Sequence, residues 1–148
     1  MSRIGRRDTK PEVALRKALH ARGKRYALDK RGLPGRPDIF MARHRAAVFV
    51  HGCFWHGHGC GACRVPTANQ DYWRRKFARN RERDAAARSA LIARGYRVAT
   101  IWECAVRLDP ETAAEELLRW LEGGRNALEI EKREGAVHAR EDDPTLDA

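Results

Sequence analysis

Residues 51–60, with the sequence HGCFWHGHGC, place two cysteines and three histidines within ten positions. The chain has no run of 18 apolar residues, and its first ten residues lack the apolar stretch of a signal peptide, so we expect a cytoplasmic protein without a membrane segment. Cysteines stay reduced in that compartment, which favours metal ligation over disulfide bonds. The sequence therefore predicts a metal site built around this loop.

Three of the four ligands of a tetrahedral zinc site lie in the loop: Cys53, His58 and Cys60. Cys104 follows a predicted strand, and it would reach the loop if that strand lay parallel to the strand that precedes the loop. Four protein ligands leave no open coordination position, so such a zinc would hold the loop and take no part in chemistry. Two alternatives stay open: Cys63 competes as the fourth ligand, or Cys104 is a buried small side chain without a metal.

The hydrophobic pattern gives an order of helix, strand pair, helix, strand and helix, which predicts a single α/β or α+β domain. Thr9 and Glu12 form a capping box at the start of the first helix. Asp109 caps the last helix, which stops at Gly123. The predicted elements are helix 10–22, strands 38–42 and 46–50, helix 70–94, strand 97–103 and helix 110–122.

Residues 125–148 are charged and contain no aromatic residue, so we expect them to form a poorly ordered tail. The folded domain would comprise residues 1–124 and begin with a basic arm, residues 1–9. The tail carries four basic and seven acidic residues, so the net charge of +10 becomes +13 on the domain. A basic domain suits a polyanion, and arginine, which binds phosphate bidentately, supplies 24 of the 30 basic residues. The alternative is a compositional bias toward arginine that serves only solubility.

Phe54 and Trp55 lie between the first predicted zinc ligand and the next. A metal pins the backbone on both sides of them, so at least one ring should project outward. Apolar rings on a rigid loop of a basic protein can wedge between base pairs of DNA. In the alternative interpretation, both rings pack beneath the loop.

Two carboxylates stand out against apolar surroundings. Asp38 opens a predicted strand, where it could hold Mg²⁺ together with substrate phosphate oxygens, although an aspartate after a proline is more often part of a turn. Asp84 falls on the apolar face of the long helix, so its carboxylate should point inward. The alternative for Asp84 is a surface pair with Arg81. The apolar positions that define this face are Trp73, Phe77, Ala87 and Leu91.

Five motifs carry a resemblance to a known family: LPGRPDIF, VFVHGCFWHGHGC, the YW that opens the long helix, NRERD and GYRVATIWEC. In this order, across roughly residues 1–122, they resemble the very short patch repair endonucleases. The resemblance implies a restriction-endonuclease-like fold, with a central mixed sheet flanked by helices and a structural zinc. It also implies a magnesium-dependent bacterial enzyme, monomeric and acting at the nucleoid with mismatch-repair proteins as candidate partners. Its substrate would be double-stranded DNA with a T:G mismatch, nicked on the 5′ side of the mispaired T that arises when 5-methylcytosine deaminates.

The resemblance also implies roles for individual residues. Asp38 and the backbone carbonyl of Val50 would hold Mg²⁺, and His56 would be the general base, oriented by Asp84. Glu12 and His51 match positions near the metal-bound waters. The zinc ligands would be Cys53, His58, Cys60 and Cys104, and the DNA-binding residues Phe54, Trp55, Met1 and Arg3. Many family members carry a hydroxyl residue in place of Val50, so a carbonyl ligand survives here but a hydroxyl contact does not.

Two other functions compete with this interpretation. One is a zinc-stabilised DNA-binding module without catalysis, and the other is a related nuclease of different specificity. Asp38, His56 and Asp84 favour a nuclease over the binding module, because binding alone needs no buried carboxylate beside a histidine.

Overall fold

The computed structural model describes residues 9–28, 30–60 and 66–142. Its centre is an open six-stranded sheet in which neighbouring strands follow the chain order. The two inner pairs, β3–β4 and β4–β5, are parallel and the other three are antiparallel, so the predicted mixed α/β architecture is confirmed. The strands are β1 (Ala27–Leu28), β2 (Ile39–Met41), β3 (Ala46–His51), β4 (Arg97–Trp102), β5 (Ala127–Arg133) and β6 (Ala136–Asp142).

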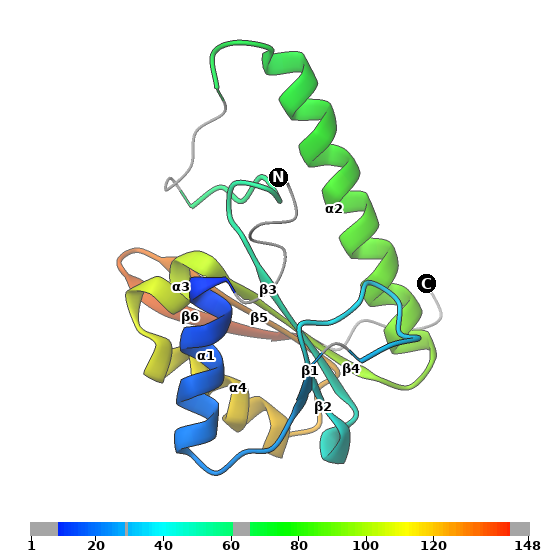
Figure 1. The fold of residues 1–148 in the computed structure, drawn as a ribbon, viewed down its shortest axis with the longest axis vertical. Helices are drawn as coiled ribbons and strands as arrows, with labels where there is room; N and C mark the ends of the chain where they lie inside the picture. Colours follow the sequence, from blue (N-terminus) through cyan, green and yellow to red (C-terminus); the bar gives the residue numbers. More distant parts are fainter. Residues whose placement is uncertain (1–8, 29, 61–65, 143–148) are drawn as a thin grey trace.

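Helices cover both faces of the sheet (Figure 1). The predicted caps are present: the Thr9 side chain accepts the Glu12 N–H, and Asp109 accepts the Thr112 N–H. The short helices η1 and α3 and the strand β1 were not predicted. The helices are α1 (Lys10–Ala21), η1 (Ala42–His44), α2 (Gln70–Ala93), α3 (Glu103–Leu108) and α4 (Pro110–Glu122). No helix in the described ranges is both long and apolar enough to cross a membrane.

Side chains alternate between two cores, one on each face of the sheet. On β3, Val48 faces the larger core with α1, α3 and α4, while Phe49 faces the smaller core with α2. Only the last turns of α2 pack in that smaller core, through Leu91 and Ile92. The rest of α2 extends past the end of the sheet (Figure 1), so its first half is free to pack on the loop that follows β3.

The prediction of a poorly ordered tail is wrong for residues 127–142, which form β5 and β6. Leu128 and Ile130 alternate with Glu129 and Glu131, and the apolar pair is buried in the larger core. The prediction rested on the average composition of the tail and overlooked this alternation. Apolar residues at every second position are the pattern of a strand with one buried face.

The register of the parallel strands determines where the functional loops meet. His51 at the end of β3 pairs with Trp102 at the end of β4. The loop that begins at Gly52 therefore starts beside the helix α3, which carries Cys104 in its first turn. The predicted parallel pairing of these two strands is confirmed, and it brings together chain segments about fifty residues apart.

Candidate active site and metal centre

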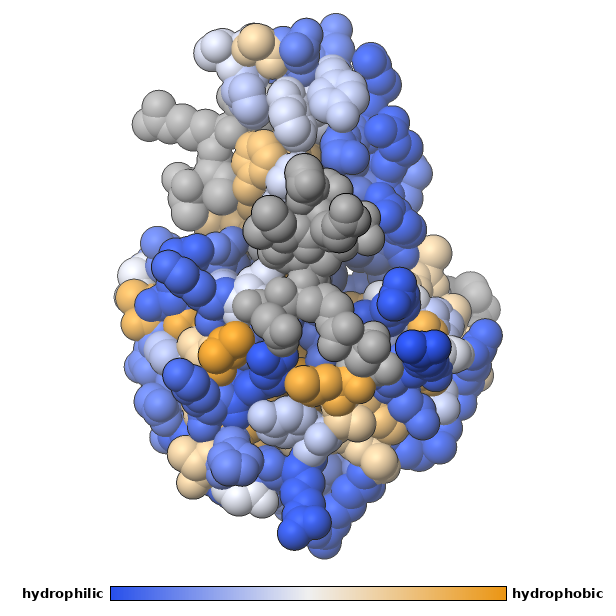
Figure 2. Space-filling view, in the orientation of Figure 1, coloured by the Kyte–Doolittle hydropathy of each residue, from blue (hydrophilic) through white to orange (hydrophobic). Residues whose placement is uncertain are grey.

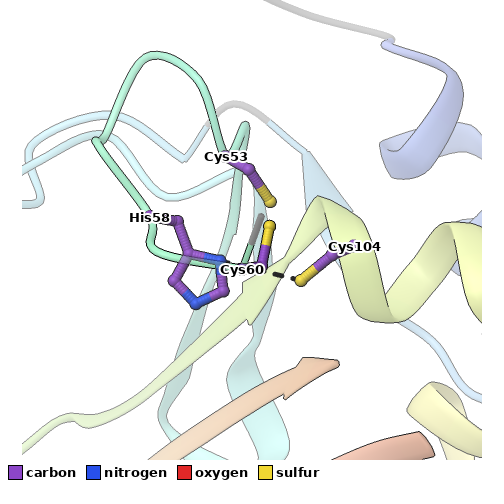
Figure 3. A group of neighbouring side chains, drawn as sticks. All are labelled: Cys53, His58, Cys60 and Cys104. Carbon is purple, nitrogen blue, oxygen red and sulfur yellow. Dashed lines mark hydrogen bonds between the residues drawn. The ribbon is translucent and has the colours of Figure 1, made fainter. Parts of the chain in front are cut away.

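The structure brings Cys53, His58, Cys60 and Cys104 together at the end of the sheet (Figure 3). One ligand atom from each residue lies within 4.8 Å of all the others. The distance between the Cys104 Sγ and His58 Nδ1 atoms is 3.7 Å, close to the roughly 3.6 Å that follows from tetrahedral zinc with ordinary Zn–S and Zn–N bond lengths. Cys63, the competing ligand, lies outside the described residues. This cluster could hold a metal ion.

The electrostatics of the cluster favour ligation by sulfur. The Cys53 side chain, the backbone N–H of Lys132 and nearby His58 lower the pKa of Cys104 to about 5, even though burial raises it. The pKa of Cys53 is raised, first by its contact with Cys104 and then by burial, because the two thiols share one proton. Three sulfurs and one imidazole nitrogen form a donor set that suits a borderline-soft cation and not Mg²⁺ or Ca²⁺.

A second group of side chains joins the loop to α2. His56 Nδ1 is hydrogen-bonded to Asp84 Oδ2, and His51 Nδ1 lies 4.0 Å from the same oxygen. The two histidine rings are stacked, with centroids 4.0 Å apart and planes 6° from parallel. Asp84 therefore points inward as predicted. Arg81, its alternative partner, instead donates to the carbonyl of Gly57 at 3.5 Å.

Their surroundings give His51 and Asp84 different charges: His51 is neutral and Asp84 is ionised. Burial lowers the pKa of His51 to about 4, with a further contribution from His56, so His51 is neutral at physiological pH. Burial raises the pKa of Asp84, but the hydrogen bond from His56 and the nearby imidazoles outweigh it and leave that pKa below its ordinary value. His56 therefore has an ionised carboxylate on Nδ1, an arrangement that makes the other ring nitrogen a good proton acceptor.

Asp38 and Glu12 form the third part of the site. Asp38 Oδ2 accepts the backbone N–H of Val50 at 2.7 Å. Burial raises the pKa of Asp38 to about 7, the Val50 N–H opposes this rise, and Glu12 adds to it. Two adjacent carboxylates, one buried and one partly buried, resist ionisation together, and a bound cation would relieve that repulsion. Oxygen ligands of this kind fit a hard divalent cation.

One open cleft of about 1380 Å³ joins the carboxylates to the histidines. It runs between α1, the ends of β2 and β3, and α2. The predicted catalytic residues that line it are Glu12, Asp38, Val50, His51, His56 and Asp84.

The two aromatic residues of the loop have different environments. Trp55 is 52% exposed and also lines the cleft. Phe54 is partly buried, with its ring 5.3 Å from those of Trp73 and Phe77 on α2. Asn80 on α2 donates to the Trp55 carbonyl at 2.6 Å, which ties the loop to the helix. The expectation that at least one ring projects outward is confirmed for Trp55; Met1 and Arg3 lie outside the described residues.

Comparisons with known proteins identify the family of this site. The family model described as DNA mismatch endonuclease Vsr matches residues 1–62. The chain is 46% identical over 104 residues to the type II nicking enzyme V.XorIIP of Xanthomonas oryzae pv. oryzae, covering 70% of this chain and 76% of that protein. It is 37% identical over 135 residues to the DNA mismatch endonuclease Vsr of Escherichia coli, covering 88% and 86%. The chain belongs to the Vsr endonuclease family.

The relatives in this family are named as DNA endonucleases, and the cleft is the candidate active site of this chain. Two supports of the metal cluster in this Vsr-family chain escaped sequence reasoning. Glu103 Oε1 accepts the Cys53 N–H at 3.2 Å, and the Lys132 N–H donates to Cys104 Sγ at 3.3 Å. Glu103 had a visible signal, since it stands at the end of a predicted strand beside Cys104. Lys132 acts through its backbone and left no signal in its side chain.

Proposed function

We propose that this chain nicks duplex DNA at T:G mismatches, on the 5′ side of the mispaired T that deamination of 5-methylcytosine produces. The observation that carries the proposal is the His56–Asp84 pair in the same cleft as the Asp38–Glu12 carboxylates. A DNA-binding module without catalysis has no use for this arrangement. We also assign the domain to the restriction-endonuclease-like folds, supported by the mixed sheet and by a carboxylate at the start of β2.

The proposed chemistry is hydrolysis of one phosphodiester bond. Mg²⁺, held by Asp38 and the Val50 carbonyl, would stabilise negative charge on the scissile phosphate when bound. Asp84 accepts a hydrogen bond at His56 Nδ1, which leaves Nε2 to take the proton from the attacking water. The carboxylate also stabilises the imidazolium that results. Neutral His51 stacks on His56 and keeps its ring in place without adding charge.

Zinc is the metal that we infer for the Cys53, His58, Cys60 and Cys104 cluster, because its donor set and spacing match a closed tetrahedral site. Such a site has no coordination position for substrate. Its proposed role is to fix the loop that carries both Trp55 and His56. The position of the DNA-contacting ring relative to the general base then stays constant.

Contacts with DNA phosphates are assigned to α2. Its surface is mostly hydrophilic on the face drawn in Figure 2. The cations on that helix supply salt-dependent affinity for a duplex of any sequence, whereas Trp55 contributes to recognition of the mismatch. The exposed arginines of α2 are Arg74, Arg75, Arg79, Arg81, Arg83 and Arg88.

The proposal is tested with end-labelled duplexes that carry T:G, T:A or C:G at one position, incubated with the protein with and without Mg²⁺. We expect a single nick 5′ of the mispaired T, only in the T:G duplex and only with Mg²⁺. Equal nicking of the T:A duplex would identify a nuclease of different specificity. Binding without any nicking would identify a DNA-binding module.

The exposed ring of Trp55 gives a prediction about the preference for T:G over T:A duplex. A T:G pair stacks less well than a proper pair, so inserting Trp55 beside it costs less than the same insertion in intact duplex. Trp55→Ala should therefore reduce the preference for T:G over T:A duplex by roughly 5- to 150-fold, the equivalent of about 1–3 kcal/mol of stacking. Affinity for T:A duplex should change less, and binding of both duplexes is measured at one salt concentration. The matched control is Leu108→Ala, another exposed apolar residue that does not line the cleft.

The zinc assignment predicts a difference between two cysteines. Wild-type protein should contain about one zinc per chain, by the four-ligand argument, and Cys104→Ser should lose it. We expect the melting temperature of Cys104→Ser to fall by roughly 10 °C or more, because a structural zinc contributes directly to folding. Cys63→Ser is the matched control and should keep both zinc and stability. The opposite pattern would make Cys63 the fourth ligand, and a stable wild-type protein without zinc would refute the site.

A further inference from the structure

The two ring nitrogens of His58 face different partners. Nδ1 points toward the sulfur cluster and lies 3.7 Å from Cys104 Sγ. Nε2 lies on the other side of the ring, 2.8 Å from Oε1 of Glu131. A neutral imidazole carries one proton on only one nitrogen, so the partner of Nε2 decides whether Nδ1 has a lone pair to offer a metal.

We propose that Glu131 is a positioning residue of the metal centre, which accepts the Nε2–H of His58 and so makes Nδ1 the metal ligand. This inference rests on the proposed structural zinc. A carboxylate accepts hydrogen bonds and donates none, so it selects the tautomer protonated at Nε2. A carboxylate behind a ligating histidine also makes the ligand more basic and fixes the plane of its ring.

The surroundings hold both members of this pair in place. The His58 ring is stacked on Trp102, with centroids 4.1 Å apart and planes 5° from parallel. Trp102 is itself fixed by a 2.8 Å hydrogen bond from its Nε1 to Glu129 Oε2. Arg133 donates to Glu131 Oε2 at 2.9 Å, which leaves Oε1 directed at His58. The Glu131 side chain is 19% exposed, so water competes only weakly for the contact.

Strand β5 therefore contacts two of the four ligands from outside the loop and α3. Glu131 reaches His58 through its side chain, and the backbone N–H of the next residue, Lys132, donates to Cys104 Sγ. Hydrogen bonds to a thiolate stabilise its charge, and the carboxylate fixes the imidazole. The affinity of the cluster for its metal should thus depend on a strand that supplies no ligand.

The test measures zinc affinity by competition with a chromogenic chelator in the full-length chain. Glu131→Ala should weaken zinc binding by roughly 10- to 100-fold, the usual effect of removing such a partner. Glu131→Gln should weaken it less, because the amide oxygen still accepts the Nε2–H. Lys132→Ala is the control; it removes a neighbouring charge but keeps the backbone N–H that donates to Cys104 Sγ, so zinc affinity should change by less than about threefold.

A spectroscopic measurement separates positioning from a general loss of structure. In zinc-loaded wild-type protein, the ¹⁵N chemical shifts of the His58 ring should show a proton on Nε2 and metal on Nδ1. Metal on Nε2, or wild-type zinc affinity in folded Glu131→Ala, would overturn the assignment to Glu131 while leaving the structural zinc intact. A wild-type protein that binds no zinc would instead remove the zinc proposal itself and this inference with it.

Discussion

Asp38→Asn should bind a T:G duplex with nearly wild-type affinity and nick it at least ~10³-fold more slowly, because it loses the several kcal/mol that a metal ion contributes to phosphodiester hydrolysis. Asparagine keeps the volume of the side chain and an oxygen that can accept the Val50 N–H. It lacks the negative charge that would bind the cation beside Glu12. The measurement is single-turnover nicking at saturating enzyme and Mg²⁺, with binding followed separately.

The structure offers a control for folding as well as one for charge. Burial raises the pKa of Asp38 from 3.8 to about 7, so ionising it costs the metal-free folded state stability as the pH rises through that interval. Asparagine avoids this cost, and the variant should melt at a higher temperature than the wild type at pH 8 but not at pH 4.

The control for charge is Asp71→Asn, which changes an exposed aspartate on α2 outside the cleft and should leave nicking normal. Wild-type nicking by Asp38→Asn would refute the proposed role of Asp38.

Local chemistry in the sequence predicted most of the elements that hold the site. Capping residues predicted the starts of α1 and α4, and short continuous apolar runs rich in Val, Ile and Phe predicted β2 and β3. Helical periodicity predicted that Asp84 faces inward. Each of these signals involves residues close together in the sequence, so it can be recognised without knowing the fold. The strand β1 escaped prediction because it has only two residues, both exposed, and therefore carries no hydrophobic pattern.

The arrangement of the site depended on contacts between distant segments. Cys104 reaches the loop cysteines only if β3 and β4 are parallel, which the sequence analysis had to assume. The pairing of His51 with Trp102 supports this assumption. The contact between Glu12 and Asp38 depends on how α1 docks on the sheet, which the capping box does not specify. The stacking of His51 on His56 depends on the path of a loop with several glycines. At Gly57, for example, φ is +62°, a conformation that favours glycine, and an added Cβ would lie 3.1 Å from the Phe77 side chain of α2.

Because residues 127–142 form β5 and β6 and not a disordered tail, deleting them should disrupt the fold. A chain ending after Gly124 lacks β5 and β6, and we expect it to lose cooperative unfolding and zinc binding. Burying Leu128 and Ile130 contributes about 1.5–3 kcal/mol each, out of a total stability of roughly 5–15 kcal/mol for a typical domain. The backbone pairing of β4 with β5 is lost with them, and so are the carbonyl of Arg125 that accepts from Arg97 and the N–H of Lys132 that donates to Cys104.

The matched control for this deletion is a chain ending after Asp142, which keeps both strands. It should unfold with the wild-type midpoint and retain its zinc, whereas the chain ending after Gly124 should show no sharp thermal transition by circular dichroism. The comparison isolates the hairpin from the acidic residues beyond it, because both chains lack residues 143–148. If the shorter chain melts cooperatively near the wild-type temperature, then β5 and β6 are dispensable for the fold. Equal zinc affinity in the two chains would mean that the contacts from Glu131 and Lys132 contribute nothing to the metal centre.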